Sequence, residues 1–175
     1  MPGMRNRGLL PRTACAALLA VTLPVLVAGC SSGTGVQREA PGEVQSTART
    51  DATGASLSMR ARNVDLSITA ATVRVDSSGT ARLEFTVRNA APEAEHLSTV
   101  TVPGGGQATL QGGGSATLST AGVLLAAGGS TTFGSTSPSI VLPPAKGLTV
   151  GSTLPVSLFF GVAGLVRLDV PVKAA

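Results

Sequence analysis

Short segments in which apolar and polar residues alternate follow one another from about residue 60 to the end of the chain. The clearest alternation runs over 81–88, where every second side chain is apolar: Ala81, Leu83, Phe85 and Val87. A period of two places one face of a strand against a core and the other face in solvent. After residue 29 no window sustains a helical period, and turns rich in Gly and Pro separate the segments. This pattern predicts an all-β sandwich or barrel.

Two hairpins are predicted to supply most of the core, and both are expected to be antiparallel. In the first, segment 64–75 pairs with 81–88 across a turn at 76–79. The apolar positions of this segment change parity after Ala70-Ala71, which indicates a bulge or a bend. In the second hairpin, 154–160 pairs with 166–172 through a turn at 161–164. Shorter strands are expected between the hairpins, at 97–102, 116–118, 123–125, 131–133 and 140–142.

The first 29 residues have the organisation of a secretory signal. Three arginines lie ahead of an uncharged, apolar run of 16 residues from Ala14 to Gly29. The run is shorter than the roughly 20 residues that a membrane-spanning helix needs. Its end, Val27-Ala28-Gly29-Cys30, resembles the bacterial lipobox. The resemblance implies cleavage between Gly29 and Cys30 and a diacylglyceryl group on the Cys30 thiol. An ordinary cleaved signal that leaves Cys30 as a free thiol, or an uncut anchor, is the alternative.

Cleavage at this point divides the chain into a signal peptide (1–29), a lipidated flexible tether (30–57) and a folded domain (58–175). The tether assignment rests on a composition of Ser, Thr, Gly, Ala and Gln without hydrophobic periodicity. Two acyl chains hold a protein on a membrane stably, whereas one does so only marginally. The expected location is therefore the extracytoplasmic face of the cell membrane.

The composition of the mature chain excludes several classes of function. Removal of the 29 signal residues leaves 146 of 175, and three of the 13 basic residues leave with the signal. Ten basic and nine acidic residues remain, so the net charge falls from +4 to about +1 and gives no basic patch for nucleic acid. Cys15 lies in the signal and Cys30 is expected to carry lipid, which excludes disulfides and cysteine catalysis.

Several stretches from about Val64 to Val172 resemble the PCu(A)C family of extracytoplasmic copper chaperones. They occur in the family's order, at 71–74 with 79–89, 95–97, 123–130, 148–160, 163–164 and 170–172. The stretch 123–130, for example, resembles the family's isoleucine-proline-alanine-glycine-glycine turn. The resemblance implies a single antiparallel β-sandwich of cupredoxin-like, Greek-key type.

The family holds Cu(I) with two His and two Met, and these soft ligands suit that ion. The matching positions are occupied here by Gln111, Leu118, Ser139 and Val141. The mature chain has one histidine, His96, and one methionine, Met59. One molecule therefore lacks the residues for the family's two-His, two-Met site. No metal or other cofactor is expected, and copper is kept only as an alternative, with His96 and Met59 as its candidate ligands.

The remaining candidate sites favour ordinary structural roles. His96 lies beside Glu93 and Glu95, a set that offers oxygen and imidazole to a divalent cation, but a surface histidine in a polar loop is the preferred interpretation. A Ser-His-Asp triad is disfavoured, because no G-x-S-x-G elbow occurs and His96 is the only imidazole base of the mature chain. Phe159 lies on the opposite strand face from Phe160, either as a docking spot for a partner or packed under a loop.

The sequence thus predicts a membrane-anchored lipoprotein that displays one PCu(A)C-like β-sandwich. The preferred hypothesis is a non-catalytic binding or interaction module, tethered to the membrane through Cys30, that acts on an envelope protein partner. The alternative is a divergent copper chaperone that delivers Cu(I) to a membrane oxidase.

Overall fold

The computed structural model describes residues 45–113, 117–146 and 148–175. The predicted signal peptide, Cys30 and residues 30–44 of the predicted tether lie outside these ranges. Within them the regular structure consists of 13 β-strands. The described part of the chain contains no helix with the length and apolarity to cross a membrane. The prediction of an all-β domain is confirmed.

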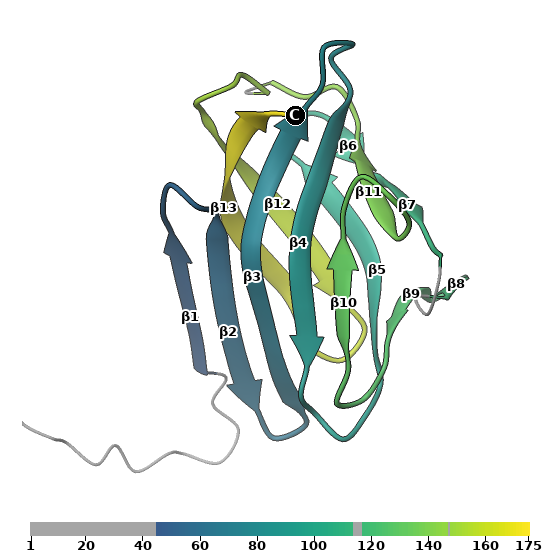
Figure 1. The fold of residues 1–175 in the computed structure, drawn as a ribbon. Coiled ribbons are helices and arrows are strands. Elements are labelled where there is room, and N and C mark those ends of the chain that lie inside the picture. Colours follow the sequence, from purple (N-terminus) through teal and green to yellow (C-terminus); the bar gives the residue numbers. More distant parts are fainter. Residues whose placement is uncertain (1–44, 114–116, 147) are drawn as a thin grey trace, which may run out of the picture. The chain divides into compact units, whose positions relative to one another are not determined.

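The first of two sheets is built around the long hairpin of β3 and β4 (Figure 1). Strands β1 and β2 extend it on one side, while β10, β11 and β7 extend it on the other. Its strands are β1 (Gln45–Thr50), β2 (Ala55–Ala61), β3 (Val64–Val75), β4 (Ala81–Asn89), β7 (Thr109–Gln111), β10 (Ser130–Phe133) and β11 (Ser139–Leu142).

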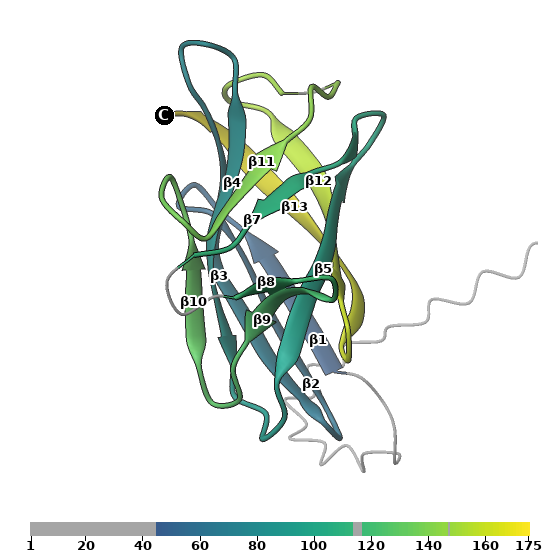
Figure 2. The same cartoon turned by 90° about the vertical axis from the view of Figure 1, so that its right-hand side faces the viewer.

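The second sheet is built around the hairpin of β12 and β13, with β5 beside β12 and the short strands β9 and β8 beyond β5 (Figure 2). The two-residue strand β6 pairs with the end of β5. Its strands are β5 (Glu95–Val102), β6 (Gly106–Gln107), β8 (Leu118–Ser119), β9 (Gly122–Leu125), β12 (Thr153–Phe160) and β13 (Gly164–Ala174). Both predicted hairpins are confirmed.

Strand β13 belongs to both sheets. Its residues from Gly164 to Pro171 pair with β12, and its last residues, 172–174, pair with 73–75 of β3. The second pairing is parallel, whereas the other strand pairs of the described residues are antiparallel. Alternation of apolar residues predicts that a segment is a strand but carries no information about the direction of its neighbour. The crossing joins the two sheets along one side.

The parity change in the first hairpin is a β-bulge, as predicted. The register between β3 and β4 shifts between Thr69 and Thr72, and Ala70 adopts a φ of 55°. The extra residue returns the side chains that follow to the buried face, so Ile68 and Val73 are both fully buried although they differ in parity.

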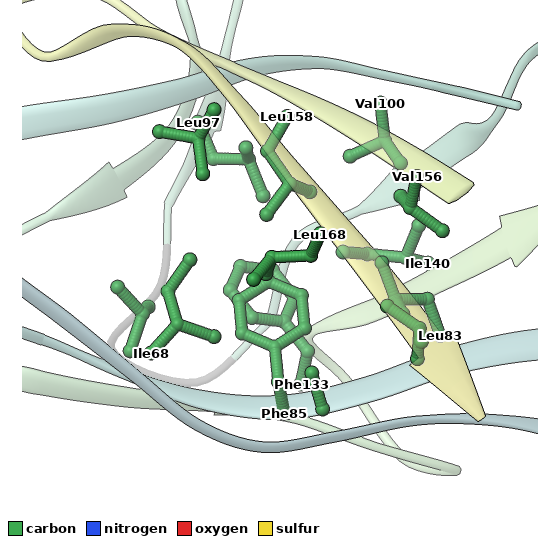
Figure 3. Packing of buried hydrophobic residues seen from close by; sticks show 14 of the residues in the cluster. Ile68, Leu83, Phe85, Leu97, Val100, Phe133, Ile140, Val156, Leu158 and Leu168 are labelled. Carbon is green, nitrogen blue, oxygen red and sulfur yellow. The ribbon is translucent and has the colours of Figure 1, made fainter. Parts of the chain in front are cut away.

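The core lies between the two sheets and consists almost wholly of aliphatic side chains (Figure 3). Ile68 and Leu83 reach it from the first sheet, and Leu97, Val100 and Leu158 from the second. Phe85 and Phe133 are stacked, with ring centroids 4.8 Å apart. Because the core is formed by side chains from both sheets, each sheet buries its inner face only by packing against the other.

The predicted boundary between tether and domain at residue 57 is wrong. Residues 45–50 form β1, and β2 begins at Ala55. Every side chain of β1 is exposed, so the strand is held by its backbone pairing with β2 and by the Thr50 hydroxyl, which donates to the Asp169 carbonyl at 2.8 Å. A strand without a buried face gives no hydrophobic alternation, and the sequence pattern therefore missed it.

Two tight turns of the first sheet are closed by aspartates. In the β1–β2 turn, the Asp51 carboxylate accepts hydrogen bonds from the Thr53 hydroxyl and the backbone N–H groups of Thr53 and Gly54, which lowers its pKa. In the β3–β4 turn, hydrogen bonds from the Ser78 hydroxyl and from the backbone N–H groups of Thr80 and Ser78 lower the pKa of Asp76.

Candidate functional site

Two of the four positions that match the family's copper ligands are direct neighbours. Gln111 on β7 and Ser139 on β11 are paired in register. The Ser139 hydroxyl donates a hydrogen bond to the Gln111 side-chain carbonyl at 2.9 Å. Ser139 is 4% exposed, whereas Gln111 is exposed. The fold therefore brings these two positions together.

The other two positions contribute only hydrocarbon. Val141 lies two residues after Ser139, on the same face of β11, and is half-buried. Leu118 lies on β8, pairs with Val123 and is 47% exposed. Neither side chain has an atom that can donate an electron pair to a metal.

The chemistry of this set does not suit Cu(I). That ion favours thioether, thiolate and imidazole ligands. Gln111 and Ser139 offer hard amide and hydroxyl oxygens, and these already satisfy one another by hydrogen bonding. Across the described residues, no three His, Cys, Asp or Glu side chains gather in a way that could hold a metal ion.

Met59 and His96 do not converge. Met59 is in β2 of the first sheet, 8% exposed and part of the hydrophobic core. His96 is in β5 of the second sheet, next to the buried Leu97, so strand alternation turns its side chain away from the core. A two-ligand Cu(I) site of the methionine sulfur and this imidazole therefore has no geometric support within one molecule.

The carboxylate of Glu95 has a structural role that the sequence analysis missed. Glu95 is 3% exposed and accepts hydrogen bonds from three backbone N–H groups. These come from His96 at 2.7 Å, from Val162 at 2.9 and 3.1 Å, and from Ala163 at 2.8 Å. The carboxylate thus ties the start of β5 to the turn between β12 and β13.

This arrangement leaves no divalent-cation cluster at 93–96. Glu93 is exposed, and Glu95 is buried and occupied with backbone donors. A signal for the burial of Glu95 was present in the sequence, because Glu95 shares its strand parity with the apolar residue Leu97. Charged residues are seldom fully buried unless paired, so the sequence pattern alone did not predict the buried, structural role of Glu95.

Phe159 is exposed on the outer face of β12, while Leu158 and Phe160 are buried. Packing under a loop, the more usual outcome for such a residue, is therefore not what the structure shows.

Comparison with known proteins identifies the architecture. No protein-family model matches the chain, and no curated protein matches it in sequence. Among solved structures, the apo PCuAC domain from PmoF1 superposes with a TM-score of 0.55 at 26% identity, covering 63% of this chain and 94% of that domain. The copper-bound PCuAC domain from PmoF2 gives a TM-score of 0.52 at 22% identity, covering 63% and 93%.

These similarities define a cupredoxin-like β fold. More narrowly, the domain has a PCuAC-like fold and is a copper-chaperone-like domain. The likeness concerns the backbone. Gln111, Leu118, Ser139 and Val141 are the residues that the sequence resemblance matches to the family's ligand positions.

Proposed function

We propose that this chain is a lipoprotein that displays its PCuAC-like domain on the extracytoplasmic face of the cell membrane. The domain acts there as a non-catalytic binding module for a protein of the envelope. It does not hold copper in the manner of the PCu(A)C family. No group of the chain is assigned a role in catalysis.

The observation that carries the proposal is the hydrogen bond between Ser139 and Gln111 at the family's ligand positions. The backbone brings these positions together, yet the side chains present are matched to one another and not to a soft metal ion. Leu118 and Val141 offer only hydrocarbon, which suits contact with a protein surface better than coordination. The membrane anchor is supported by the apolar run and the Val-Ala-Gly-Cys sequence that ends at Cys30.

A Cu(I) competition titration against a chromogenic chelator tests the binding half of this proposal. The chain from Ser31 onward is expected not to compete. His96→Ala and Met59→Leu are titrated beside it; leucine conserves the volume of this core position while it removes the sulfur. Tight, stoichiometric binding that either substitution abolishes would overturn the proposal.

Metabolic labelling with a clickable fatty acid tests the anchor. Label is expected on the wild-type chain and absent from Cys30→Ala. Label that persists in this variant would refute lipidation at Cys30.

A divergent copper chaperone that delivers Cu(I) to a membrane oxidase is the second candidate. The copper-bound structure of the PCuAC domain from PmoF2 favours it, because a domain of this fold holds the ion there. For this chain it requires ligands shared between molecules or with a partner. Copper that binds only in the presence of a second molecule in the same titration distinguishes this candidate.

A further inference from the structure

Three large, exposed apolar side chains gather at the tip of the hairpin between β12 and β13. Phe159 and Leu165 are paired in register across the two strands, and Val162 lies in the turn between them. The exposed fractions of Phe159, Leu165 and Val162 are 37%, 44% and 50%. Phe159 and Leu165 point away from the core, because their neighbours Leu158, Phe160 and Val166 are buried in it, and Val162 is exposed in the turn. We call Phe159, Val162 and Leu165 the hairpin tip.

The fold holds the hairpin tip in place. The turn that carries Val162 is fixed by the buried Glu95 carboxylate, which accepts from the backbone N–H groups of Val162 and Ala163. The Gly161 N–H donates to the His96 carbonyl at 3.0 Å. On the strand, the Ser98 hydroxyl donates to the Phe159 carbonyl at 2.9 Å. Because the turn is ordered before any contact forms, docking through it loses little conformational entropy.

The hairpin tip lies at the end of the domain where the described chain begins. β13 runs parallel to β3, so both strands start at the same end, and β3 starts directly after the β2–β3 turn. Gln45, the first described residue, pairs with Arg60 beside that turn. Figure 1 shows the β12–β13 loop in the lower part of the domain, toward the end where β1 and β3 begin.

The chain between the predicted lipid attachment and the domain is short. Gln45 follows Cys30 by 15 positions. Even a fully extended chain of this length spans no more than about 54 Å. A lipid on Cys30 therefore keeps Gln45, which lies at the same end of the domain as the hairpin tip, within that distance of the membrane.

A polar row lies directly behind the hairpin tip on the same face. Thr101, Ser157 and Arg167 are register partners across β5, β12 and β13, two residues further from the turn than Phe159 and Leu165. They line a shallow depression of about 380 Å³. Two residues of a strand advance by about 7 Å. Apolar side chains at the tip, followed by two hydroxyls and an exposed guanidinium, reproduce the order of acyl chains and phosphates in a bilayer surface.

We propose that the hairpin tip docks onto the lipid bilayer, with Phe159, Val162 and Leu165 among the outer acyl segments and Arg167 at the level of the lipid phosphates. The inference rests on the lipid anchor of the proposed function and adds a second contact with the membrane to it. It fixes the orientation of the domain, which a tether alone leaves free. A short lipid anchor and a small apolar patch reinforce one another, because the anchor raises the effective concentration of the membrane at the patch.

The absence of Trp and Tyr from the chain makes a direct test possible. Phe159→Trp introduces a single indole at the hairpin tip. Val150→Trp is the matched control: Val150 is 56% exposed and precedes Gly151, whose N–H donates to the Val172 carbonyl at the opposite end of β13. Each full-length, lipidated variant is reconstituted in vesicles of phosphatidylcholine and phosphatidylglycerol, with and without brominated acyl chains, and its indole emission is recorded.

We expect brominated lipid to quench the indole of the Phe159→Trp variant several-fold more than that of Val150→Trp. A blue shift of the emission is expected for the Phe159→Trp variant alone. A second substitution, Val162→Asp, added to Phe159→Trp, is expected to abolish this quenching while the protein still floats with the vesicles.

Three outcomes overturn the docking in different ways. Flotation with equal quenching of the two single-indole variants overturns the docking and leaves the anchor intact. Loss of flotation overturns both. A blue shift that occurs without lipid and grows with protein concentration assigns the hairpin tip to a second copy of the chain, and equally overturns membrane docking.

Discussion

The two long hairpins and the short strands between them belong to the same domain, but they differ in what they contribute to its core and to its candidate site. The hairpins β3–β4 and β12–β13 provide most of the buried side chains, and their register follows the hydrophobic pattern. Strands β7, β8 and β11 are two to four residues long and carry Gln111, Leu118, Ser139 and Val141. The backbone of this PCuAC-like domain is thus specified by the hairpins. The positions that the resemblance matches to the family's ligands lie on short elements whose side chains can change without loss of the core.

The strongest challenge to this comparison is to restore the family's ligands. The variant Gln111→His, Leu118→Met, Ser139→His, Val141→Met places two imidazoles and two thioethers at the matching positions. We expect a gain of stoichiometric Cu(I) binding, from none in the parent chain, because soft ligands on a retained scaffold suit this ion. A competition titration with a chromogenic chelator measures it.

The double variant Gln111→His, Ser139→His is the control and is expected to bind more weakly, since it lacks both sulfur ligands. No binding by the fourfold variant, in a protein that still folds, would mean that the scaffold of the site has diverged along with its ligands.

A pair of leucine truncations measures how differently the two regions bear on stability. Leu158→Ala removes a side chain that is 1% exposed within β12, and we expect a loss of about 2–5 kcal/mol in the free energy of unfolding. Leu118→Ala, at a ligand position, is expected to change it by no more than about 0.5 kcal/mol. Urea unfolding of both variants gives the comparison. Similar losses would show that β8 is part of the structural core.

Glu95→Gln probes the contact that joins β5 to the β12–β13 turn. The amide keeps one acceptor oxygen but places an NH2 group against backbone donors, so we expect a loss of about 1–3 kcal/mol in the free energy of unfolding. The neighbouring Glu93→Gln is the control, because the Glu93 side chain is exposed and its substitution is expected to be nearly neutral. Equal effects of the two substitutions would contradict the structural role of Glu95.

The smallest expected effect concerns the turn of the first hairpin and depends on pH. Hydrogen bonds, first that from the Ser78 hydroxyl, lower the pKa of Asp76 in the folded chain. Its stabilising contribution is therefore present above the ordinary pKa of an aspartate, and is lost as the pH falls through the lowered folded pKa. We expect wild type to exceed Asp76→Asn in thermal stability at neutral pH, and the difference to shrink between about pH 5 and pH 2.

Ser77→Ala, in the same turn, is the control and should follow the wild-type curve, since Ser77 is exposed. A gap between wild type and Asp76→Asn that stays constant down to low pH would contradict this account of the turn.

The parts of the fold that were predictable are those in which apolar alternation reports a buried face. The bulge at Ala70 was among them, because the parity of the apolar residues changes there. Strand β1 was not, since its six polar or small residues are all exposed and are held through backbone hydrogen bonds. The parallel pairing of β13 with β3 was likewise inaccessible, because it joins segments whose proximity only the folded chain establishes.

The candidate site was predictable in its composition but not in its contacts. The identities of Gln111, Leu118, Ser139 and Val141 followed from the resemblance to the PCu(A)C family, whereas the hydrogen bond between Gln111 and Ser139 required coordinates. For Glu95 the sequence did not reveal the true partner. Its carboxylate was considered as a ligand for a cation, but it accepts hydrogen bonds from backbone N–H groups. A single sequence does not show which polar groups form hydrogen bonds with one another.

The crossing of β13 between the sheets also has a consequence for the order of folding. The Arg74 guanidinium donates to the carbonyl of Ala174, and these residues are 100 positions apart in the chain. Contacts at such separations form slowly, because a long loop must close before they stabilise anything. The pairing of β13 with β3 therefore forms later than the local hairpins β3–β4 and β12–β13, because it joins segments about 100 residues apart. In a domain with this topology the hairpins can form early, and the contact between β13 and β3 that joins the two sheets forms last.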